Sequence, residues 1–475
     1  MQNLINQKYT KFLWILCLLA IGSFLLTLNL PLVGEEGVYT NAALEMIFTK
    51  QYKFATLYGN IYPRPPLYNW LIIVFSKIFN PKNIVLSARM VAVTATTLMA
   101  ITVFFTAKYL FNTNKQDQTT SLLISSKNTT IQFALFTSAI FLSGDVLFKR
   151  GWLAYSDPIF AMFVFASIAL LLIGTINNNL LLIFFANVCV FLGFLCKVHT
   201  SYVFYIITFF VLLLTKYNKN LLRKNVMFLH ILFITPLIFW NIYWQESDCF
   251  FTAFSHMKRL AGISNNPEAN LLGNIVIFPL QTWLALLPCS LVALFALKNL
   301  FKNKYNIQPI IKILLWVTIL NFAPYWITSQ TNIRYLLPIY PLFSIIIAYI
   351  IWQSNLIKQA IILLFISMLL KYVVAIFWYP HQYNIKQGNA ELVAKDILLH
   401  TNNYPLYINS FSATGLRIAG EINKINWPKK PLQQYPQNNM LYFVIQEDQS
   451  MGTQHLRLIK HYKLNKDQIF LYIHE

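Results

Sequence analysis

The chain has 475 residues, of which 57% are hydrophobic and 11% charged, and its mean hydropathy is +0.53. Soluble domains carry about 25% charged residues, so this composition excludes an ordinary soluble protein and indicates a polytopic membrane protein. The net charge of +21 does not indicate nucleic-acid binding, because the basic residues are scattered between apolar runs and form no single stripe or arm.

Eleven apolar segments are predicted to span the membrane, since about 20 residues cross the hydrocarbon. They cover 12–31, 84–110, 131–148, 158–175, 180–196, 201–215, 226–244, 274–298, 309–327, 335–352 and 358–379. Allowing for missed or merged segments, we expect about 11–13 transmembrane helices. Lys and Arg gather in alternate loops, which predicts a cytoplasmic N-terminus and, with an odd number of spans, an outer C-terminus.

Two segments outside the spans are expected to fold. The first outer loop, 32–83, is predicted to hold two interfacial helices, Val38–Ile47 and Leu67–Phe79, and to belong to a transmembrane domain of residues 1–380. Residues 381–475 contain no spanning run and are predicted to form a small extracytoplasmic α/β domain. Its expected elements are a helix over Asn389–His400 and strands over Leu406–Ile408, Leu441–Ile445 and Ile469–Ile473.

An acidic pair, Glu35-Glu36, follows the first span and is flanked by Gly34 and Gly37. Ionising two adjacent carboxylates in a low-dielectric cleft costs considerable free energy. One of them is therefore expected to bind a cation or to have a raised pKa. A carboxylate with a pKa near neutrality can take a proton from an attacking hydroxyl. We assign that role to Glu36 and an orienting role to Glu35. The alternative is a pair of solvated loop acids.

Cations and aromatic residues are predicted at the same outer face. Arg64 lies within Tyr62-Pro63-Arg64-Pro65-Pro66, where the prolines restrict the backbone, so it is a candidate phosphate ligand or, alternatively, part of a rigid turn at the interface. Other candidates lie near the ends of later spans, and each has a plain alternative as a helix cap or headgroup anchor. These candidates are Arg150, Asp157, Lys197, His256, Arg259, Arg334 and Tyr335.

Two motifs of the first loop carry a resemblance to a known family. Glu35, Glu36 and Tyr39 form an acidic pair with a tyrosine three residues beyond its second member. Arg64-Pro65-Pro66-Leu67-Tyr68-Asn69-Trp70 is a basic residue followed by Pro-Pro and an aromatic run. Both resemble the GT-C type membrane glycosyltransferases that use polyprenyl-phosphate sugars. The likeness is greatest to the branch of protein O-mannosyltransferases and the lipid A aminoarabinose transferase, in which the first acid is usually Asp and the basic residue usually Lys.

Weaker matches to this family continue through most of 12–352. They are Arg150 with Asp157, Lys197, His256 with Arg259, and the run Arg334-Tyr335-Leu336-Leu337-Pro338. Some relatives carry a metal-binding Glu just before the basic residue of the Pro-Pro motif. Pro63 occupies that position here, which leaves a divalent metal doubtful.

The resemblance implies a glycosyltransferase that moves a sugar from a polyprenyl-phosphate donor to a lipid, glycan or protein acceptor, with inversion. Glu36 and Glu35 would be catalytic, and a hydroxyl acceptor would need the base whereas a phosphate acceptor would not. The donor phosphate would be held by Arg64, Lys197, Arg259 and Arg334. Further substrate contacts would come from Tyr39, Tyr62, Arg150, Asp157, His256 and Tyr335.

The implied location is a bacterial inner membrane, with the C-terminal domain in the periplasm.

The main alternative to the transferase is a transporter or flippase for polyprenyl lipids. Such proteins tend to place binding residues near the membrane midplane and to contain internal repeats. The acids here are at the outer ends of spans and no repeat is present, which favours the transferase. A non-catalytic assembly partner is a third possibility.

Overall fold

The computed structural model describes residues 2–62, 64–112, 127–197, 199–243, 271–302, 307–327, 332–402, 404–434, 441–447, 456–464 and 467–474. The chain divides into two compact units. The bundle unit comprises Met1–Leu25, Val93–Trp152 and Asp157–Tyr372, and the loop-and-sheet unit comprises Leu26–Ala92, Leu153–Ser156 and Val373–Glu475. The first loop thus shares a unit with the C-terminal part, whereas the sequence-based division grouped it with residues 1–380.

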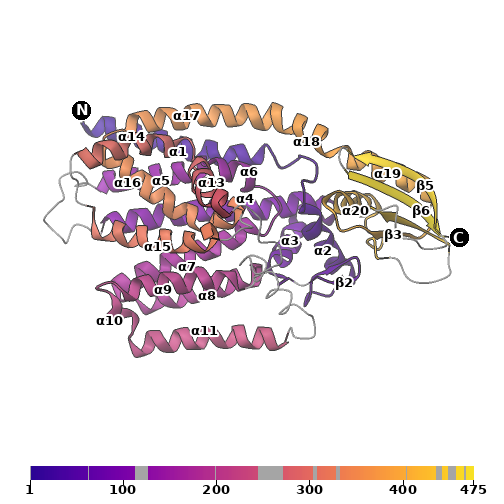
Figure 1. Cartoon of the computed structure of the whole chain (residues 1–475), viewed down its shortest axis with the longest axis horizontal. Coiled ribbons are helices and arrows are strands. Elements are labelled where there is room, and N and C mark those ends of the chain that lie inside the picture. Colours follow the sequence, from indigo (N-terminus) through magenta and orange to yellow (C-terminus); the bar gives the residue numbers. More distant parts are fainter. Residues whose placement is uncertain are drawn as a thin grey trace. The chain divides into compact units, whose positions relative to one another are not determined.

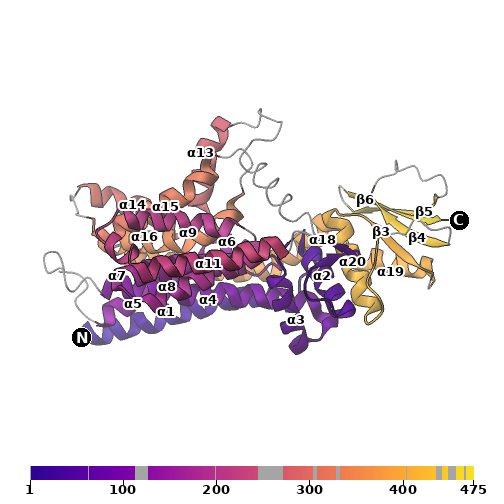
Figure 2. The same ribbon diagram turned by 90° about the horizontal axis from the view of Figure 1, so that it is seen from below.

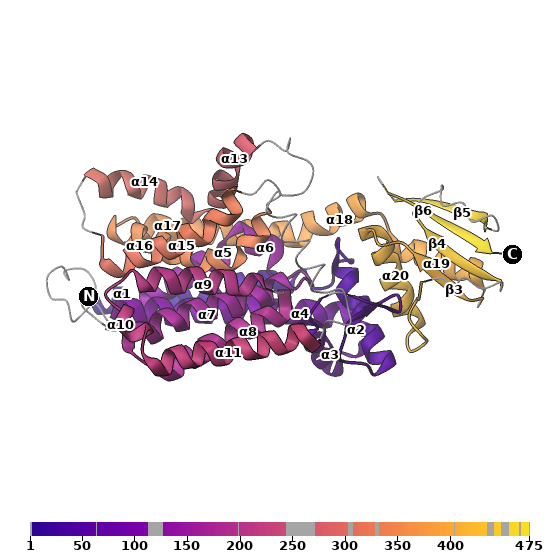
Figure 3. The same cartoon turned by 60° about the horizontal axis from the view of Figure 1, so that its bottom comes forward.

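The bundle unit is built from helices whose apolar runs match the predicted spans. Helices α7, α8 and α9 pack on one another, and α11 lies along α8 (Figures 1 and 3). The elements are α1 (Gln2–Leu25), α4 (Ile84–Asn112, shared with the other unit), α5 (Lys127–Ser143), α6 (Asp145–Arg150), α7 (Asp157–Asn177), α8 (Leu180–Lys197), α9 (Thr200–Leu213), α10 (Asn218–Leu221), α11 (Lys224–Tyr243), α13 (Leu271–Leu284), α14 (Cys289–Lys302), α15 (Pro309–Ile327), η3 (Ile333–Ile339), α16 (Tyr340–Gln353) and α17 (Ile357–Val373).

Six helical segments in the described residues are long and apolar enough to cross a membrane, and seven if a bent pair counts as one span. The polytopic helical fold class is confirmed. One predicted span, 274–298, is corrected, because the chain bends by 109° between Ile275–Leu284 and Cys289–Lys298. Pro288 lies in this break and has no N–H to continue a helical ladder. The predicted span 131–148 is likewise divided at Gly144 into α5 and α6.

The loop-and-sheet unit contains both predicted interfacial helices and the predicted C-terminal sheet. The sheet has the order β3-β4-β6-β5, in which β3 and β4 are parallel and the other neighbours antiparallel, and α19 packs on α20 (Figure 2). The elements are α2 (Glu36–Thr49), β1 (Thr56–Leu57), β2 (Asn60–Ile61), α3 (Leu67–Phe79), η1 (Pro81–Asn83), η4 (Val374–Trp378), α18 (Tyr379–Gln387), α19 (Ala390–Thr401), β3 (Leu406–Asn409), α20 (Ala413–Asn426), β4 (Tyr442–Gln446), β5 (Leu456–Leu464) and β6 (Asp467–His474).

Helix α20, which the sequence reasoning did not predict, packs closely against α2. A Cβ on Gly37 would lie 2.5 Å from the backbone oxygen of Leu416, so only glycine fits at this crossing without a shift. The amide of Asn41 donates to the same oxygen at 3.1 Å, and Asn423 donates to Asn41 Oδ1 at 3.0 Å. Helix α2, which begins at Glu36, is therefore supported by α20 of the C-terminal segment.

A short hairpin, also not predicted, joins α2 to α3. Tyr58 and Gly59 have φ of +56° and +81°, the combination that a tight two-residue hairpin turn requires. Their backbone N–H groups donate to Glu45 Oε1 and Oε2 at 2.5 and 3.1 Å. Burial raises the pKa of the Glu45 carboxyl, while these two hydrogen bonds act in the opposite direction. Glu45 thus fixes the hairpin to α2.

Candidate functional site

Glu36 is the first residue of α2 and is fully buried. Arg89 of α4, equally buried, donates from Nε to Oε1 at 3.0 Å and from Nη2 to Oε2 at 2.5 Å. The backbone N–H groups of Ala154 and Val33 donate to Oε1 and Oε2 at 2.8 and 2.7 Å. A carboxylate offers about four acceptor positions, and all are occupied here. This geometry favours Glu36 as an anchor over Glu36 as the proton acceptor.

Arg89 completes this anchor on the other side. It donates from Nη1 to the backbone oxygens of Leu28 and Leu30 at 2.9 and 2.5 Å, and from Nη2 to that of Pro31 at 2.8 Å. The guanidinium therefore joins the turn after α1 to the start of α2. Sequence reasoning missed Arg89, although a lone arginine in an apolar helix is a signal that a buried partner exists.

Glu35 lies in the opposite environment, because its side chain is exposed. Its backbone N–H donates to the Tyr155 hydroxyl at 3.1 Å, and this hydroxyl donates to the Val33 oxygen at 3.3 Å. Gly34 has a φ of +55°, and a Cβ there would lie 2.5 Å from the Tyr155 hydroxyl oxygen. The turn thus favours glycine and holds the backbone of Glu35, whose side chain is exposed.

Arg64 makes polar and ring contacts with Tyr39 and Tyr62. Its Nη1 donates to the Tyr39 hydroxyl at 2.7 Å, and that hydroxyl lies 3.1 Å from Ser156 Oγ. The guanidinium carbon is 5.6 Å from the centre of the Tyr62 ring, within cation–π range. Burial raises the pKa of Tyr62 to about 12, with Arg64 acting in the opposite direction, so the phenol keeps its proton near neutral pH. The charge of Glu35 acts on Tyr62 as well and raises the pKa of its phenol, so we call Glu35, Tyr39, Tyr62, Arg64 and Ser156 the Glu35 cluster.

A second cluster of predicted residues forms within the bundle unit. Asp157 begins α7 and forms an ion pair with Lys197, the last residue of α8. Lys197 Nζ is 4.7 Å from the centre of the Tyr335 ring, and the Arg334 guanidinium carbon is 5.4 Å from the same centre. We call these four residues the Tyr335 cluster.

Of the remaining candidates, only Arg150 lies among the described residues, and it belongs to neither cluster. Arg150 ends α6, is partly exposed, and makes no hydrogen bond or ion pair to either cluster within the described residues. His256 and Arg259 lie in 244–270, outside the described residues. No group of three His, Cys, Asp or Glu side chains suited to a metal ion occurs in the described part of the chain.

Comparisons with known proteins place this architecture in the class of GT-C folds. Neither a family model nor a curated protein sequence matches the chain. The crystal structure of ArnT from Cupriavidus metallidurans bound to undecaprenyl phosphate is similar with a TM-score of 0.68, 12% identity, and 97% of each chain covered. Its apo form gives 0.65 over the same share.

A second solved structure has the same general fold. The oligosaccharyltransferase of Archaeoglobus fulgidus in its apo form is similar with a TM-score of 0.50 and 10% identity, covering 87% of this chain and 64% of the other. At these identities the likeness concerns the fold. It confirms the GT-C-like fold class that the sequence motifs suggested, with its small C-terminal sheet domain.

Proposed function

We propose that this protein is an inverting glycosyltransferase that moves a sugar from a polyprenyl-phosphate-linked donor to an acceptor outside the cytoplasm. The observation that carries the proposal is the likeness, over 97% of both chains, to an ArnT structure that contains undecaprenyl phosphate. ArnT is the lipid A aminoarabinose transferase. The acceptor here is a glycolipid such as lipid A, a glycan or a protein, and the chain lies in a bacterial inner membrane with its N-terminus cytoplasmic.

In this proposal Arg64 and Lys197 contact the donor phosphate, together with Arg334 and Arg259. A guanidinium binds phosphate oxygens in pairs, and the contacts of Arg64 with Tyr39 and Tyr62 fix its direction before substrate arrives. Neutralising the phosphate promotes its departure as the acceptor oxygen attacks the anomeric carbon from the opposite face.

The two acids take the reverse of the roles expected from the sequence. Glu35 is exposed, so its carboxylate can accept the proton of an acceptor hydroxyl. Glu36, held by Arg89, positions the backbone from which Glu35 extends. An acceptor that is already an ionised phosphate would need no base, and Glu35 would then orient the sugar or the acceptor.

The test compares envelope lipids and glycans by mass spectrometry in cells with the native gene, a deletion, Glu35→Gln and Glu391→Gln. Glu391 is a matched control, since it is an exposed acid that forms a surface pair with Lys395. We expect a sugar-sized mass to be lost in the deletion and in Glu35→Gln and kept in the control. Full product with Glu35→Gln and a hydroxyl acceptor would remove Glu35 as the base.

A transfer assay with the purified full-length protein separates the transferase from a flippase. Transfer releases free polyprenyl phosphate from the donor, whereas transport leaves the donor intact. Replacing Arg64 with Ala removes a charge-assisted contact and is expected to slow release about ten- to a hundred-fold. Lys82→Ala, which removes an exposed cation from the same loop, should leave the rate unchanged. An intact donor in the presence of acceptor would contradict the transferase.

A further inference from the structure

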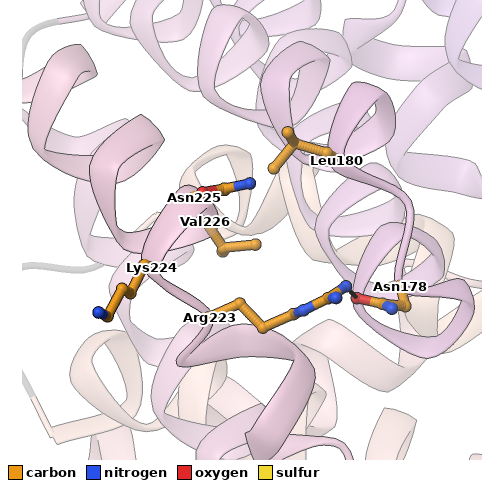
Figure 4. A pocket seen from close by; sticks show the side chains of 6 residues that line it. All are labelled: Asn178, Leu180, Arg223, Lys224, Asn225 and Val226. Carbon is orange, nitrogen blue, oxygen red and sulfur yellow. Dashed lines mark hydrogen bonds between the residues drawn. The ribbon is translucent and has the colours of Figure 1, made fainter.

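A pocket of about 350 Å³ lies in the bundle unit, where the turn between α7 and α8 meets the start of α11 (Figure 4). Six residues line it, and Figure 4 shows the Arg223 side chain extending towards Asn178. They are Asn178, Leu180, Arg223, Lys224, Asn225 and Val226. None of them belongs to the Glu35 or the Tyr335 cluster, so the proposed transferase function leaves this pocket unexplained.

The walls of the pocket are fixed by hydrogen bonds. Asn220 of α10 donates from Nδ2 to the Thr175 oxygen near the end of α7 at 2.9 Å, which ties the α10–α11 corner to α7. Asn179 Oδ1 accepts from the backbone N–H of Leu181 at 3.0 Å and caps α8. Arg223 Nη1 donates to Asn178 Oδ1 across the pocket. The cavity is therefore held open by the fold.

Within the described part of the chain, no carboxylate forms an ion pair with the cations of this pocket. Arg223 and Lys224 are its two cations, and the sequence contains no Asp or Glu anywhere in 158–245. Arg223 donates to a neutral amide, which leaves its charge in place. The start of α11 at Lys224 adds a further partial positive charge. These features select an anion.

The position of the pocket indicates that the anion it binds is amphipathic. Helix α7 runs from Asp157 to Asn177 and rises about 30 Å, so the pocket and Asp157 lie at opposite ends of a membrane-spanning helix. Leu180 and Val226 give the pocket an apolar edge, and Leu180 is itself partly exposed. Basic pockets at the ends of spanning helices are suited to anionic lipid headgroups.

We propose that this pocket binds the phosphodiester headgroup of an anionic phospholipid, from the leaflet opposite to the Asp157 end of α7. Arg223 and Lys224 contact the phosphate oxygens, Asn178 and Asn225 contact the polar headgroup, and the acyl chains leave past Leu180. The site does not depend on the glycosyltransferase function, and its test needs no enzymatic activity.

The experiment measures lipid retention by the full-length protein in mixed phosphatidylcholine–phosphatidylglycerol micelles, using native mass spectrometry. The pocket variant is Arg223→Gln with Lys224→Gln. The control is Lys216→Gln with Lys219→Gln, which removes the same charge from exposed neighbours that do not line the pocket. We expect the pocket variant to weaken phosphatidylglycerol binding about tenfold or more and the control to retain it. Phosphatidylcholine, which carries no net charge, should bind weakly to all three proteins.

Three outcomes would overturn the proposal. Equal retention by the native protein and the pocket variant would show that the pocket does not hold the lipid. Equal loss in both double variants would show a diffuse surface attraction. Binding of inorganic phosphate in the same assay, without retention of phosphatidylglycerol, would identify a soluble phosphate as the ligand. Circular dichroism and gel filtration of each variant establish that the fold is intact.

Discussion

The ion pair between Glu36 and Arg89 gives the sharpest test of the site. Glu36→Ala removes two charge-assisted hydrogen bonds to Arg89 and two from backbone N–H groups, all at buried residues. Breaking a buried pair by removing one partner typically costs about 3–5 kcal/mol. Arg89 keeps its bonds to three backbone oxygens, so we expect a loss near the lower end, about 3 kcal/mol.

The assay is unfolding of the full-length protein in a detergent–lipid mixture, followed by tryptophan fluorescence. Glu35→Ala is the matched control, because it removes the same charge one residue away from an exposed position and should stay within about 0.5 kcal/mol. Glu36→Met, Arg89→Met and the double variant with both substitutions form, with the native protein, a double-mutant cycle. The double variant places two apolar side chains at these buried positions and should recover much of the stability that the single variants lose.

The result that refutes this reasoning is a Glu36→Ala variant as stable as the native protein, or a cycle without coupling. A second refutation would come from activity. If a Glu36→Gln variant that is fully folded lost all transfer while Glu35→Gln lost none, the assignment of Glu36 as anchor would be wrong, and the base assignment would return to Glu36.

Three further predictions concern other parts of the chain. Gly37→Ala, which forces a Cβ against the Leu416 oxygen, should destabilise the protein by about 1–3 kcal/mol in the same unfolding assay. Hydrogen bonds from strand β5 lower the pKa of Asp396, so its stabilisation is present near neutral pH and lost as pH falls below its ordinary value of 3.8. Asp396→Asn should therefore lower thermal stability at neutral pH and flatten the decline towards pH 3; an unchanged pH profile would contradict this. Lys197→Met should slow donor turnover at least tenfold and, by leaving Asp157 unpaired, also lower the melting temperature; a normal rate would remove Lys197 from the site.

Hydropathy was enough to find the spanning helices, because the bilayer fixes the length of an apolar run that crosses it. It could not find the 109° bend in 274–298, since an apolar sequence carries little information about helix direction. Strand β5 escaped prediction because Arg457, Lys460 and Lys463 interrupt its alternation. Charged side chains are common on edge strands such as this one, where they discourage pairing with other chains.

The motifs located the acidic pair and Arg64 but could not tell which acid is buried. That difference arises from the start of α2 at Glu36 and from Arg89, which is 53 residues away in sequence. The local sequence around Glu36 contains no information about a partner that lies so far along the chain. The sequence identified Asp157 and Lys197 as candidates near the ends of spans. It could not show that they form an ion pair, since 40 positions separate them and each has an ordinary alternative role.

The contact of Asn41 with Leu416 spans 375 positions of sequence. At translation rates of 5–20 residues per second, roughly 20 to 75 s pass between synthesis of α2 and synthesis of α20. Throughout that interval the acidic loop has been synthesised but lacks the surface against which Gly37 and Asn41 pack. This part of the protein is therefore among the first to be made and the last to be finished, and a nascent chain stalled before residue 413 cannot complete it.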